Sequence, residues 1–346
     1  MASAELSNEQ RRQLIDATQA FEAWRYSAQE FAHSYRGSML WKKISGHEYL
    51  YRKQGSVWQS LGPRSAETED IKTSYVEART RLRQRVTRQR ARVEAMAPVN
   101  RALRLGRMPT TPARVLRKLD EVGLLGKQLI VVGTHSMFAY ETRSGVLFEG
   151  DLTATTDIDL LVDARAGMSL AVAENVRPEG IIGLLRKVDK SFARERAYRA
   201  TNDDGYFVDI IAPLRANEIT AADIKIGNAS DELIAASIIG LQWLMNAPRF
   251  EAIIIGEDGL PLWIPCIDPR AFALHKFWMS KRPDREPVKR KRDAAQAKAV
   301  YDVAVEFLNL QFNARELSAL PIELTQSAKD LAARVGKKSK GGKSKK

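Results

Sequence analysis

The sequence predicts an α+β protein, with a core made of a mixed sheet and flanking helices. Three observations support this fold class. Residues 127–265 alternate strand-like and helical segments, residues 1–126 are mostly helical in pattern with one β-hairpin, and residues 266–335 are again helical in pattern. The remaining residues, 336–346, form a lysine-rich tail that we expect to be disordered. These four segments are the predicted domain organisation.

The N-terminal region is predicted from apolar spacing and from turn residues. Apolar side chains that recur at near-helical spacing indicate helices, whereas MLWKKISGHEYLYRKQG has two strand-like runs around SGHE. Pro98 is expected to end the long second helix, because proline lacks the N–H that continues one. The elements expected in chain order are a helix over residues 7–34, a hairpin over 39–55, a helix from about Thr68 to Met96, and a helix over 113–125 that terminates at Gly126.

The central and C-terminal regions are divided by shorter apolar runs. QLIVVG is a buried strand that runs into the helix THSMFAYETRSG, and TTDIDLLVD follows as a second strand. NDDG and GEDG are turn sequences between strand-like runs, and each therefore predicts a hairpin. The expected elements are strands over 128–133 and 155–163, helices over 134–145, 177–193 and 229–246, hairpins over 197–213 and around 256–259, and helices from 268 to about 335.

The formal net charge of +13 is concentrated in two segments. Residues 79–118 hold thirteen Lys or Arg against one acid, and the last ten residues hold six lysines. Such concentrated charge attracts a polyanion, above all nucleic acid, although a solvated helix face and a solubilising tail would look the same. The candidate nucleic-acid contacts share one face of the long helix and are Arg81, Arg85, Arg88 and Arg92.

The hairpin over 39–55 interleaves aromatic and basic residues. Trp41, Tyr49 and Tyr51 alternate with Lys42, Lys43, Arg52 and Lys53, a mixture that can stack bases and hold phosphates. The same composition is ordinary for a small hairpin with one buried face, and we favour that interpretation from sequence alone.

Several protein classes are excluded or disfavoured. No apolar run approaches the roughly 20 residues of a membrane-spanning helix. The single cysteine, Cys266, cannot form an internal disulfide or a thiolate zinc cluster. The first ten residues lack the basic-then-apolar layout of a signal peptide, so we expect a cytoplasmic location.

Three carboxylates are the candidate catalytic and metal-binding residues. Asp157 and Asp159 are one residue apart on a strand and therefore emerge on the same face, while Asp209 lies among apolar neighbours in GYFVDII. A carboxylate inside an apolar strand is costly unless it is paired or bound to a cation. Oxygen ligands of this kind suit a pair of Mg²⁺ ions, with Mn²⁺ as a substitute. The alternative for Asp157 and Asp159 is the polar end of an edge strand, whereas Asp163 is interpreted as loop structure.

The turn after the first core strand is a candidate phosphate site. Gly133 allows the backbone to approach phosphate groups, and the helix that begins through Thr134 and Ser136 offers N–H donors and a favourable dipole. A hydroxyl from Ser136 could add to these contacts.

The order strand–Gly-Thr-X-Ser–helix, then Asp-X-Asp, then one Asp on a later strand resembles the polymerase-β-type nucleotidyltransferase superfamily. Lys276 in FALHKFWMSKR, followed by REPVKRKRDAAQA, resembles the third block of minimal bacterial nucleotidyltransferases, which include the abortive-infection nucleotidyltransferase toxins. VVGTHSMFAYE, LTATTDIDLL and DPRAFALHK, with GSMLWKK and EYLYRK nearer the N-terminus, are similar to a related group of bacterial nucleotidyltransferase-fold proteins. The resemblance covers nearly the whole chain except the tail.

The resemblance implies Mg²⁺-dependent transfer of a nucleoside monophosphate from a nucleoside triphosphate to an acceptor hydroxyl, with release of pyrophosphate. Asp157 and Asp159 would hold two Mg²⁺ ions, and Asp209 would ligate the catalytic ion and help to deprotonate the acceptor. RNA or tRNA is the acceptor suggested by the related toxins, with a small molecule or a protein hydroxyl left open. The implied nucleotide-binding residues are Gly133, Thr134, Ser136, Lys276 and Arg285.

Two alternatives accompany this hypothesis. The superfamily usually has Ser or Gly where Thr134 follows Gly133, and this departure supports a catalytically silent fold that binds nucleic acid or a partner protein. Lys276 lies among aromatic residues, so it could instead be a core-helix lysine that extends its charged end to solvent. The three retained carboxylates favour the enzyme.

Overall fold

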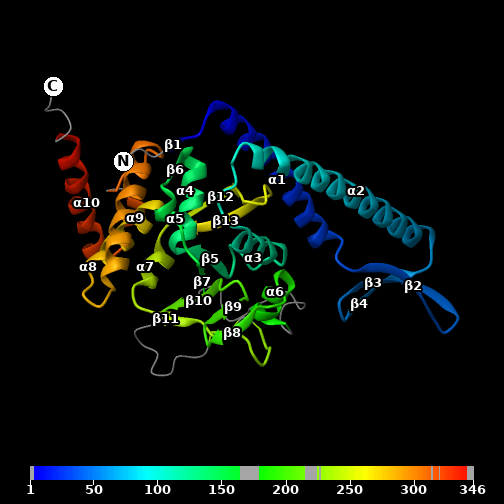
Figure 1. Cartoon of the computed structure of the whole chain (residues 1–346). Coiled ribbons are helices and arrows are strands. Elements are labelled where there is room, and N and C mark those ends of the chain that lie inside the picture. The colour runs from blue at the N-terminus through cyan, green and yellow to red at the C-terminus, as the bar shows by residue number, and fades with distance from the viewer. Residues whose placement is uncertain are drawn as a thin grey trace. The chain divides into compact units, whose positions relative to one another are not determined.

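The computed structural model describes residues 4–163, 179–214, 224–225, 227–312, 315–318 and 320–340. The chain divides into two compact units, and Figure 1 shows the elements of both. The first unit consists of Met1–Arg11, Gly106–Glu257 and Leu262–Lys346, and the second of Arg12–Leu105 and Asp258–Pro261.

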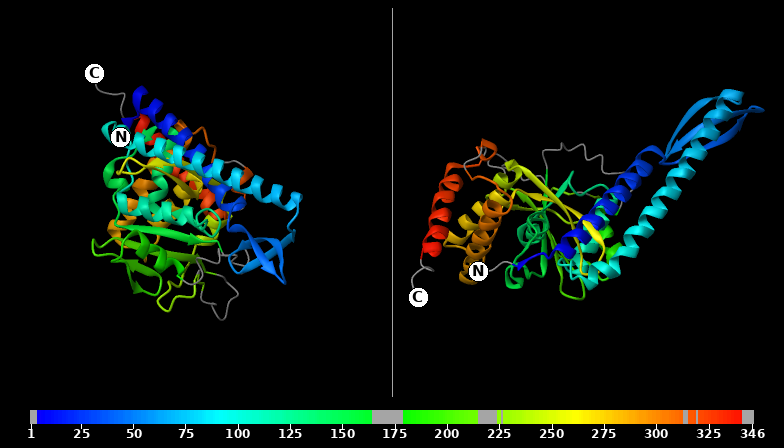
Figure 2. Two further views of the ribbon diagram at one scale, coloured as in Figure 1. Left: turned by 90° about the vertical axis from the view of Figure 1, so that its right-hand side faces the viewer. Right: turned by 90° about the horizontal axis from the view of Figure 1, so that it is seen from above.

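The second unit contains two long helices and a three-stranded antiparallel sheet. The helices lie side by side, with the sheet at one end of the pair (Figure 2). The predicted helix and hairpin are present, and a third strand follows that sequence reasoning missed because its apolar residues Val57 and Trp58 are exposed. The elements are α1 (Asn8–Ser34), β2 (Ser38–Ile44), β3 (His47–Gln54), β4 (Val57–Pro63) and α2 (Ala66–Ala102).

Helix α2 does not end before Pro98, contrary to the prediction, but continues through it to Ala102. A proline removes one helical hydrogen bond, and contacts of the next turn hold the helix together. Asn100 Nδ2 donates to the carbonyl of Gly259 at 2.8 Å, and Arg101 Nη1 donates to the carbonyl of Asp258 at 2.8 Å. At the other end, Ser65 and Thr68 form a capping box.

The first unit contains an eight-stranded mixed sheet, which confirms the predicted fold class. Strand β7 is antiparallel to β5 and parallel to β10, so these three strands form the centre of the sheet. Strand β11 (Ala236–Ile238) pairs with β10 in parallel, and a separate pair joins β1 (Ala4–Glu5) to β6 (Val146–Leu147). The other strands follow the order β12 (Arg249–Ile255), β13 (Pro261–Ile267), β5 (Leu129–Val132), β7 (Asp157–Val162), β10 (Phe207–Pro213), β9 (Arg199–Thr201) and β8 (Ala193–Arg196).

Helices flank this sheet and complete the core. The central strands are almost fully buried, and only their polar ends reach the site described below. Among the described residues, none of the helices combines the length and apolar character that a membrane span requires. The helices are α3 (Thr110–Glu121), α4 (Ser136–Ser144), α5 (Gly150–Thr153), α6 (Gly180–Val188), α7 (Leu241–Asn246), α8 (Pro269–Lys281), α9 (Pro287–Glu306) and α10 (Ile322–Lys340), with 3₁₀ turns at Gly133–His135 and Arg315–Leu317.

The prediction of a helix over 229–246 is wrong for most of this range. Residues Ala236–Ile238 form β11, and a helix, α7, covers only Leu241–Asn246. Strand β9 pairs only with Phe207–Asp209 of β10, so the following residues of β10 are left to pair in parallel with this short run. Gly240, at φ +89°, separates the strand from the helix.

Two other predicted segments differ at their ends. The helix expected over 177–193 covers Gly180–Val188, after which β8 begins at Ala193, and residues 177–178 lie outside the described residues. Helix α10 extends to Lys340, so the first part of the expected tail is helical, while residues 341–346 lie outside the described residues.

Candidate active site

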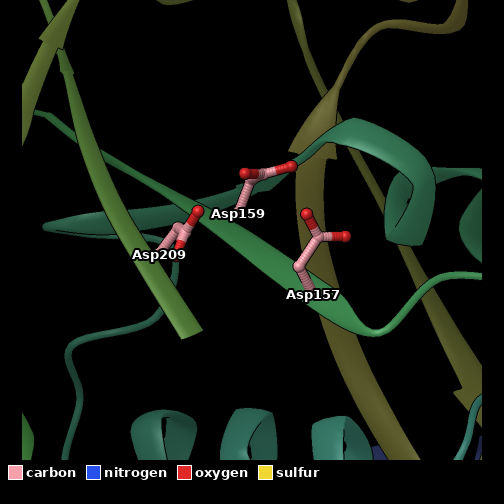
Figure 3. A group of neighbouring side chains, drawn as sticks. All are labelled: Asp157, Asp159 and Asp209. Carbon is pink, nitrogen blue, oxygen red and sulfur yellow. The ribbon is translucent and has the colours of Figure 1, made fainter. Parts of the chain in front are cut away.

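Strand register brings the three predicted carboxylates together. Asp157 and Asp159 emerge on one face of β7, and the parallel pairing with β10 sets Asp209 beside Asp159. One carboxylate oxygen from each residue lies within 4.8 Å of the other two. Figure 3 shows the three side chains pointing toward one another from the two strands.

The electrostatics of this cluster suit a bound cation. Burial, followed by the charges of Asp157 and Asp209, raises the pKa of Asp159 to about 7, while Lys276 and Arg199 oppose the shift. Three carboxylates crowded at the end of an apolar sheet repel one another unless positive charge is added. Hard oxygen ligands at this spacing fit a divalent ion such as Mg²⁺.

The turn at Gly133 is built against this cluster. Val132 pairs with Asp159 across β5 and β7, and the chain then turns at Gly133 with φ +68°. A Cβ atom at position 133 would lie 2.4 Å from Asp159 Oδ2. Glycine is therefore required here both by its backbone conformation and by the closeness of the carboxylate.

A comparison with protein families matches residues 110–321, more than half of the chain, to a family described as nucleotidyltransferase. The chain belongs to this nucleotidyltransferase family. It is a transferase of phosphorus-containing groups that moves a nucleoside monophosphate, with a nucleoside triphosphate as substrate. The matched range contains Gly133, the three carboxylates and Lys276. Comparisons with curated proteins and with solved structures give no match.

Arg199 is a site residue of this nucleotidyltransferase that sequence reasoning missed. It lies opposite Asp209 in the β9–β10 register, and its Nε and Nη2 donate to Asp209 Oδ1 and Oδ2, each at 2.6 Å. An ionised carboxylate has about four lone-pair sites, so Asp209 can accept both hydrogen bonds and still ligate a cation. A symmetric turn at NDDG would have placed Tyr198 opposite Asp209, whereas the observed loop between the strands holds one residue more, which brings Arg199 opposite Asp209.

Two residues predicted to contact phosphates have other partners in the nucleotidyltransferase. Ser136 is fully buried, and its hydroxyl donates to the carbonyl of Val131 at 3.2 Å, so the expected role of this hydroxyl on phosphates does not fit its position. Thr134 is also buried, and its hydroxyl accepts a hydrogen bond from Gln296 Nε2 at 3.2 Å. At both positions the hydroxyl forms a hydrogen bond within the protein that holds the turn in place. A sequence motif alone does not reveal these bonds.

A buried histidine and tyrosine lie next to the carboxylates. Tyr206 Oη and His135 Nε2 are 3.1 Å apart. Burial lowers the pKa of His135 to about 4, although Asp157 opposes this shift, so the imidazole is neutral near pH 7. Burial, followed by the charges of Asp157 and Asp159, raises the pKa of Tyr206. The pair therefore supplies neutral hydrogen-bonding groups and no extra charge.

Lys276 and Arg285, the predicted cationic contacts, share one buried acid. Lys276 Nζ lies 2.8 Å from Asp293 Oδ1, and Arg285 Nε lies 2.9 Å from Asp293 Oδ2. Burial alone would raise the pKa of Asp293, but the two cations lower it below its usual value. Lys276 is 15% exposed, and it is near enough to Asp159 to lower the pKa of that carboxyl. Asp293 thus orients both cations.

The arginines predicted to bind nucleic acid lie on α2, in the second compact unit. All four are exposed, and Arg81 makes an ion pair with Glu77 at 3.3 Å one helical turn away. Asp163, interpreted from sequence as loop structure, pairs with Arg249 at 2.6 Å. The set of four arginines is Arg81, Arg85, Arg88 and Arg92.

Proposed function

We propose that this nucleotidyltransferase uses Mg²⁺ to move a nucleoside monophosphate from a nucleoside triphosphate to an acceptor hydroxyl. The observation that carries the proposal is the cluster of Asp157, Asp159 and Asp209, whose oxygens lie within 4.8 Å of one another beside the Gly133 turn. The family implies a nucleoside triphosphate as substrate, and the cluster offers carboxylate ligands for the metal ions of the reaction.

The proposed step is a single displacement at phosphorus. The acceptor oxygen forms a bond to the α-phosphorus, the bond from that phosphorus to the bridging oxygen of the β-phosphate breaks, and pyrophosphate leaves with the electron pair. Asp209, oriented by Arg199, takes the proton of the acceptor hydroxyl. Mg²⁺ ions held by the three carboxylates would supply positive charge for the attacking and leaving oxygens.

Protein groups on both sides of the cluster would hold the triphosphate. The backbone at Gly133 and Thr134 precedes α4, where N–H groups and the helix dipole favour an anion. Lys276 and Arg285 supply positive charge, and their shared partner Asp293 keeps both side chains in place. Both cations would then contact phosphate oxygens while retaining Asp293 as an anchor.

Isosteric amide variants test the assignment. Asp157→Asn and Asp209→Asn keep the side-chain shape and remove the charge, so Mg²⁺-dependent transfer of label from an α-labelled triphosphate should be abolished. Asp163→Asn is the matched control, because Asp163 ends the same sequence stretch and pairs with Arg249 outside the cluster. Transfer that survives Asp157→Asn or Asp209→Asn would refute the proposal.

RNA, including tRNA, is the acceptor that the charge of α2 favours. The four exposed arginines form a stripe that can neutralise phosphates, and each phosphate contact adds about 0.9 to the slope of log affinity against log salt for a duplex region. Replacing Arg81, Arg85 and Arg88 by glutamine should weaken RNA binding and flatten this slope. Unchanged binding, or binding of the wild type that does not depend on salt, would count against an RNA acceptor.

A catalytically silent nucleotidyltransferase fold is the second candidate. Two observations favour it: the hydroxyl of Thr134 is bonded to Gln296, and both oxygens of Asp209 accept hydrogen bonds from Arg199. Thermal shift with each nucleoside triphosphate and Mg²⁺ separates the two functions, because a ligand of the folded state raises the melting temperature. A shift with one nucleotide supports the enzyme, and no shift with any of them supports the silent fold.

A further inference from the structure

The three-stranded sheet of the second unit has two unlike faces. One face carries Trp41 and the fully buried Leu50, and it packs against α2. Lys72 of α2 lies over the Trp41 ring at 5.4 Å, and Arg64 lies over the same ring at 5.2 Å. This face is therefore the inner face of the sheet.

The opposite, outer face gathers aromatic rings and lysines. The register Lys42–Tyr49 and Ser38–Lys53–Trp58 places these side chains on one surface with Tyr51. Trp58 is 43% exposed, and Lys42 and Lys53 are exposed as well. The pairing of the strands thus divides the aromatic and basic residues of the hairpin between the two faces of the sheet. The third strand adds the ring of Trp58 to the outer face.

The rings and cations of the outer face already contact one another. Lys53 Nζ lies 5.0 Å from the centre of the Trp58 ring, and Lys42 Nζ lies 5.4 Å from it. Lys42 also lies 5.8 Å from the Tyr51 ring, which meets Trp58 edge to face at 6.1 Å. Positive charge and flat apolar surface therefore alternate across a few ångströms.

Negative charge is missing from this outer face. Within residues 38–64, all of which the structure describes, Glu48 is the one acid, and it points to the inner face, where it pairs with Arg64 at 2.5 Å. A surface that exposes rings and lysines without acids complements a ligand with flat bases and a negatively charged backbone.

We propose that the outer face of the β2–β4 sheet binds single-stranded nucleic acid. Bases stack on Trp58 and Tyr51, and Lys42 and Lys53 contact the phosphates between them. A single strand is favoured over a duplex, because the bases of a duplex are stacked on one another and cannot lie on a protein ring. The inference deepens the proposed function by giving the nucleotidyltransferase a nucleic-acid site, and binding can be measured without catalysis.

The energies favour displacement of the lysines from the rings by bases. An exposed cation–π contact is weaker than the stacking of a base on an aromatic side chain. Both lysines are on flexible exposed side chains, so each can move from ring to phosphate when a base arrives. The contacts between the lysines and the rings thus keep both ammonium groups close to the positions that the phosphates of a bound strand would occupy.

The test is fluorescence anisotropy of the full chain with short labelled single strands, in EDTA and without nucleotide. RNA and DNA strands of one sequence are titrated in parallel to identify the sugar, and the matched duplex is titrated beside them. Trp58→Ala should weaken single-strand binding by roughly 5-fold to 150-fold, which corresponds to the stacking energy of one base. Val57→Ala is the matched control, because Val57 is the adjacent residue, 61% exposed, on the other face of β4.

Two further variants separate stacking from charge. Lys42→Gln with Lys53→Gln should lower the slope of log affinity against log salt by about 1.4, from about 0.7 for each phosphate contact of a single strand. Trp58→Ala should leave this slope unchanged, and Trp58→Phe should restore most of the affinity. Asp157→Asn, which removes transfer under the proposed function, should bind the strand like the wild type, so failure of catalysis and failure of this site are distinguishable.

Three results would overturn the proposal. Trp58→Ala could bind as tightly as Val57→Ala, the duplex could bind as tightly as the single strand, or neither RNA nor DNA could bind at all. Since Trp58 is partly exposed, its truncation should leave the melting temperature close to that of Val57→Ala, and this comparison excludes unfolding as the cause of lost binding.

Discussion

Gly133→Ala should remove most of the transferase activity through one displaced carboxylate. At φ +68° an alanine costs about 1–2 kcal/mol of backbone strain. The added Cβ would lie 2.4 Å from Asp159 Oδ2, whereas ordinary contact begins at 3.4 Å. The carboxylate must therefore retreat by about 1 Å, and a displacement of this size at reacting groups costs on the order of 100-fold in rate.

Gly123→Ala is a matched control for this prediction. Gly123 has φ +75°, and no atom lies within 4 Å of a Cβ built there. Both variants therefore bear the same backbone cost, so denaturant titrations should show a loss of about 1–2 kcal/mol for Gly123→Ala and at least this loss for Gly133→Ala. The Gly133 variant alone also displaces Asp159.

Transfer of α-labelled nucleotide to total cellular RNA measures the activity of both variants, and thermal shift with Mg²⁺ and nucleotide measures ligand binding. Gly123→Ala should retain activity close to that of the wild type at a temperature where both variants are folded. If Gly133→Ala retained equal activity, the turn would not set the position of Asp159, and the geometric argument would be refuted.

Other variants test the contacts around the site and in α2. Arg199→Leu leaves Asp209 buried without its partner, so the free energy of unfolding should fall by up to about 3–5 kcal/mol in urea titrations, and Asp209→Asn in the same chain should recover much of the loss. Because burial lowers the pKa of His135 from 6.5 to about 4, the folded state binds fewer protons than the unfolded state between these values. Stability should thus fall by up to about 3 kcal/mol as pH drops from 6.5 to 4, and His135→Gln should reduce this sensitivity; an unchanged pH profile would contradict it. Pro98→Ala supplies a helical N–H inside α2 and should stabilise the protein by up to about 3 kcal/mol, with a lower melting temperature as the contrary result.

Local patterns predicted the parts of this fold that depend on local physics. Apolar periodicity located the central strands, and alternation along β7 placed Asp157 and Asp159 on one face. The pattern was misleading over 229–246, where the part of β10 beyond the short strand β9 pairs with Ala236–Ile238 and makes a strand of a helix-like sequence. Propensity is a weak guide when a tertiary partner of this kind is available.

The acidic residues of the site could be predicted from the sequence, whereas the hydrogen-bond and ion-pair partners of the site residues could be predicted less well. An acid on an apolar strand is visible in one sequence, because burying it without a cation is costly. Whether the hydroxyl of Ser136 faces a ligand or the carbonyl of Val131 depends on packing around the turn, which no short motif encodes. The pairing of Arg199 with Asp209 lies between these cases, since it requires a hairpin register as well as residue types.

The charges of the site also indicate the order in which its ligands can bind. Arg199 is paired with Asp209 and Lys276 with Asp293, and neither Asp157 nor Asp159 has an ion-pair partner among the described residues. Two such carboxylates repel a triphosphate unless a divalent cation binds with it. Above pH 7, where Asp159 is ionised, Asp159→Asn should therefore have opposite effects under the two conditions: nucleotide binding in EDTA should be tighter than in the wild type, and binding with Mg²⁺ should be weaker. Isothermal titration under both conditions measures the two affinities, and equal changes in both would show that repulsion by Asp159 does not control nucleotide entry.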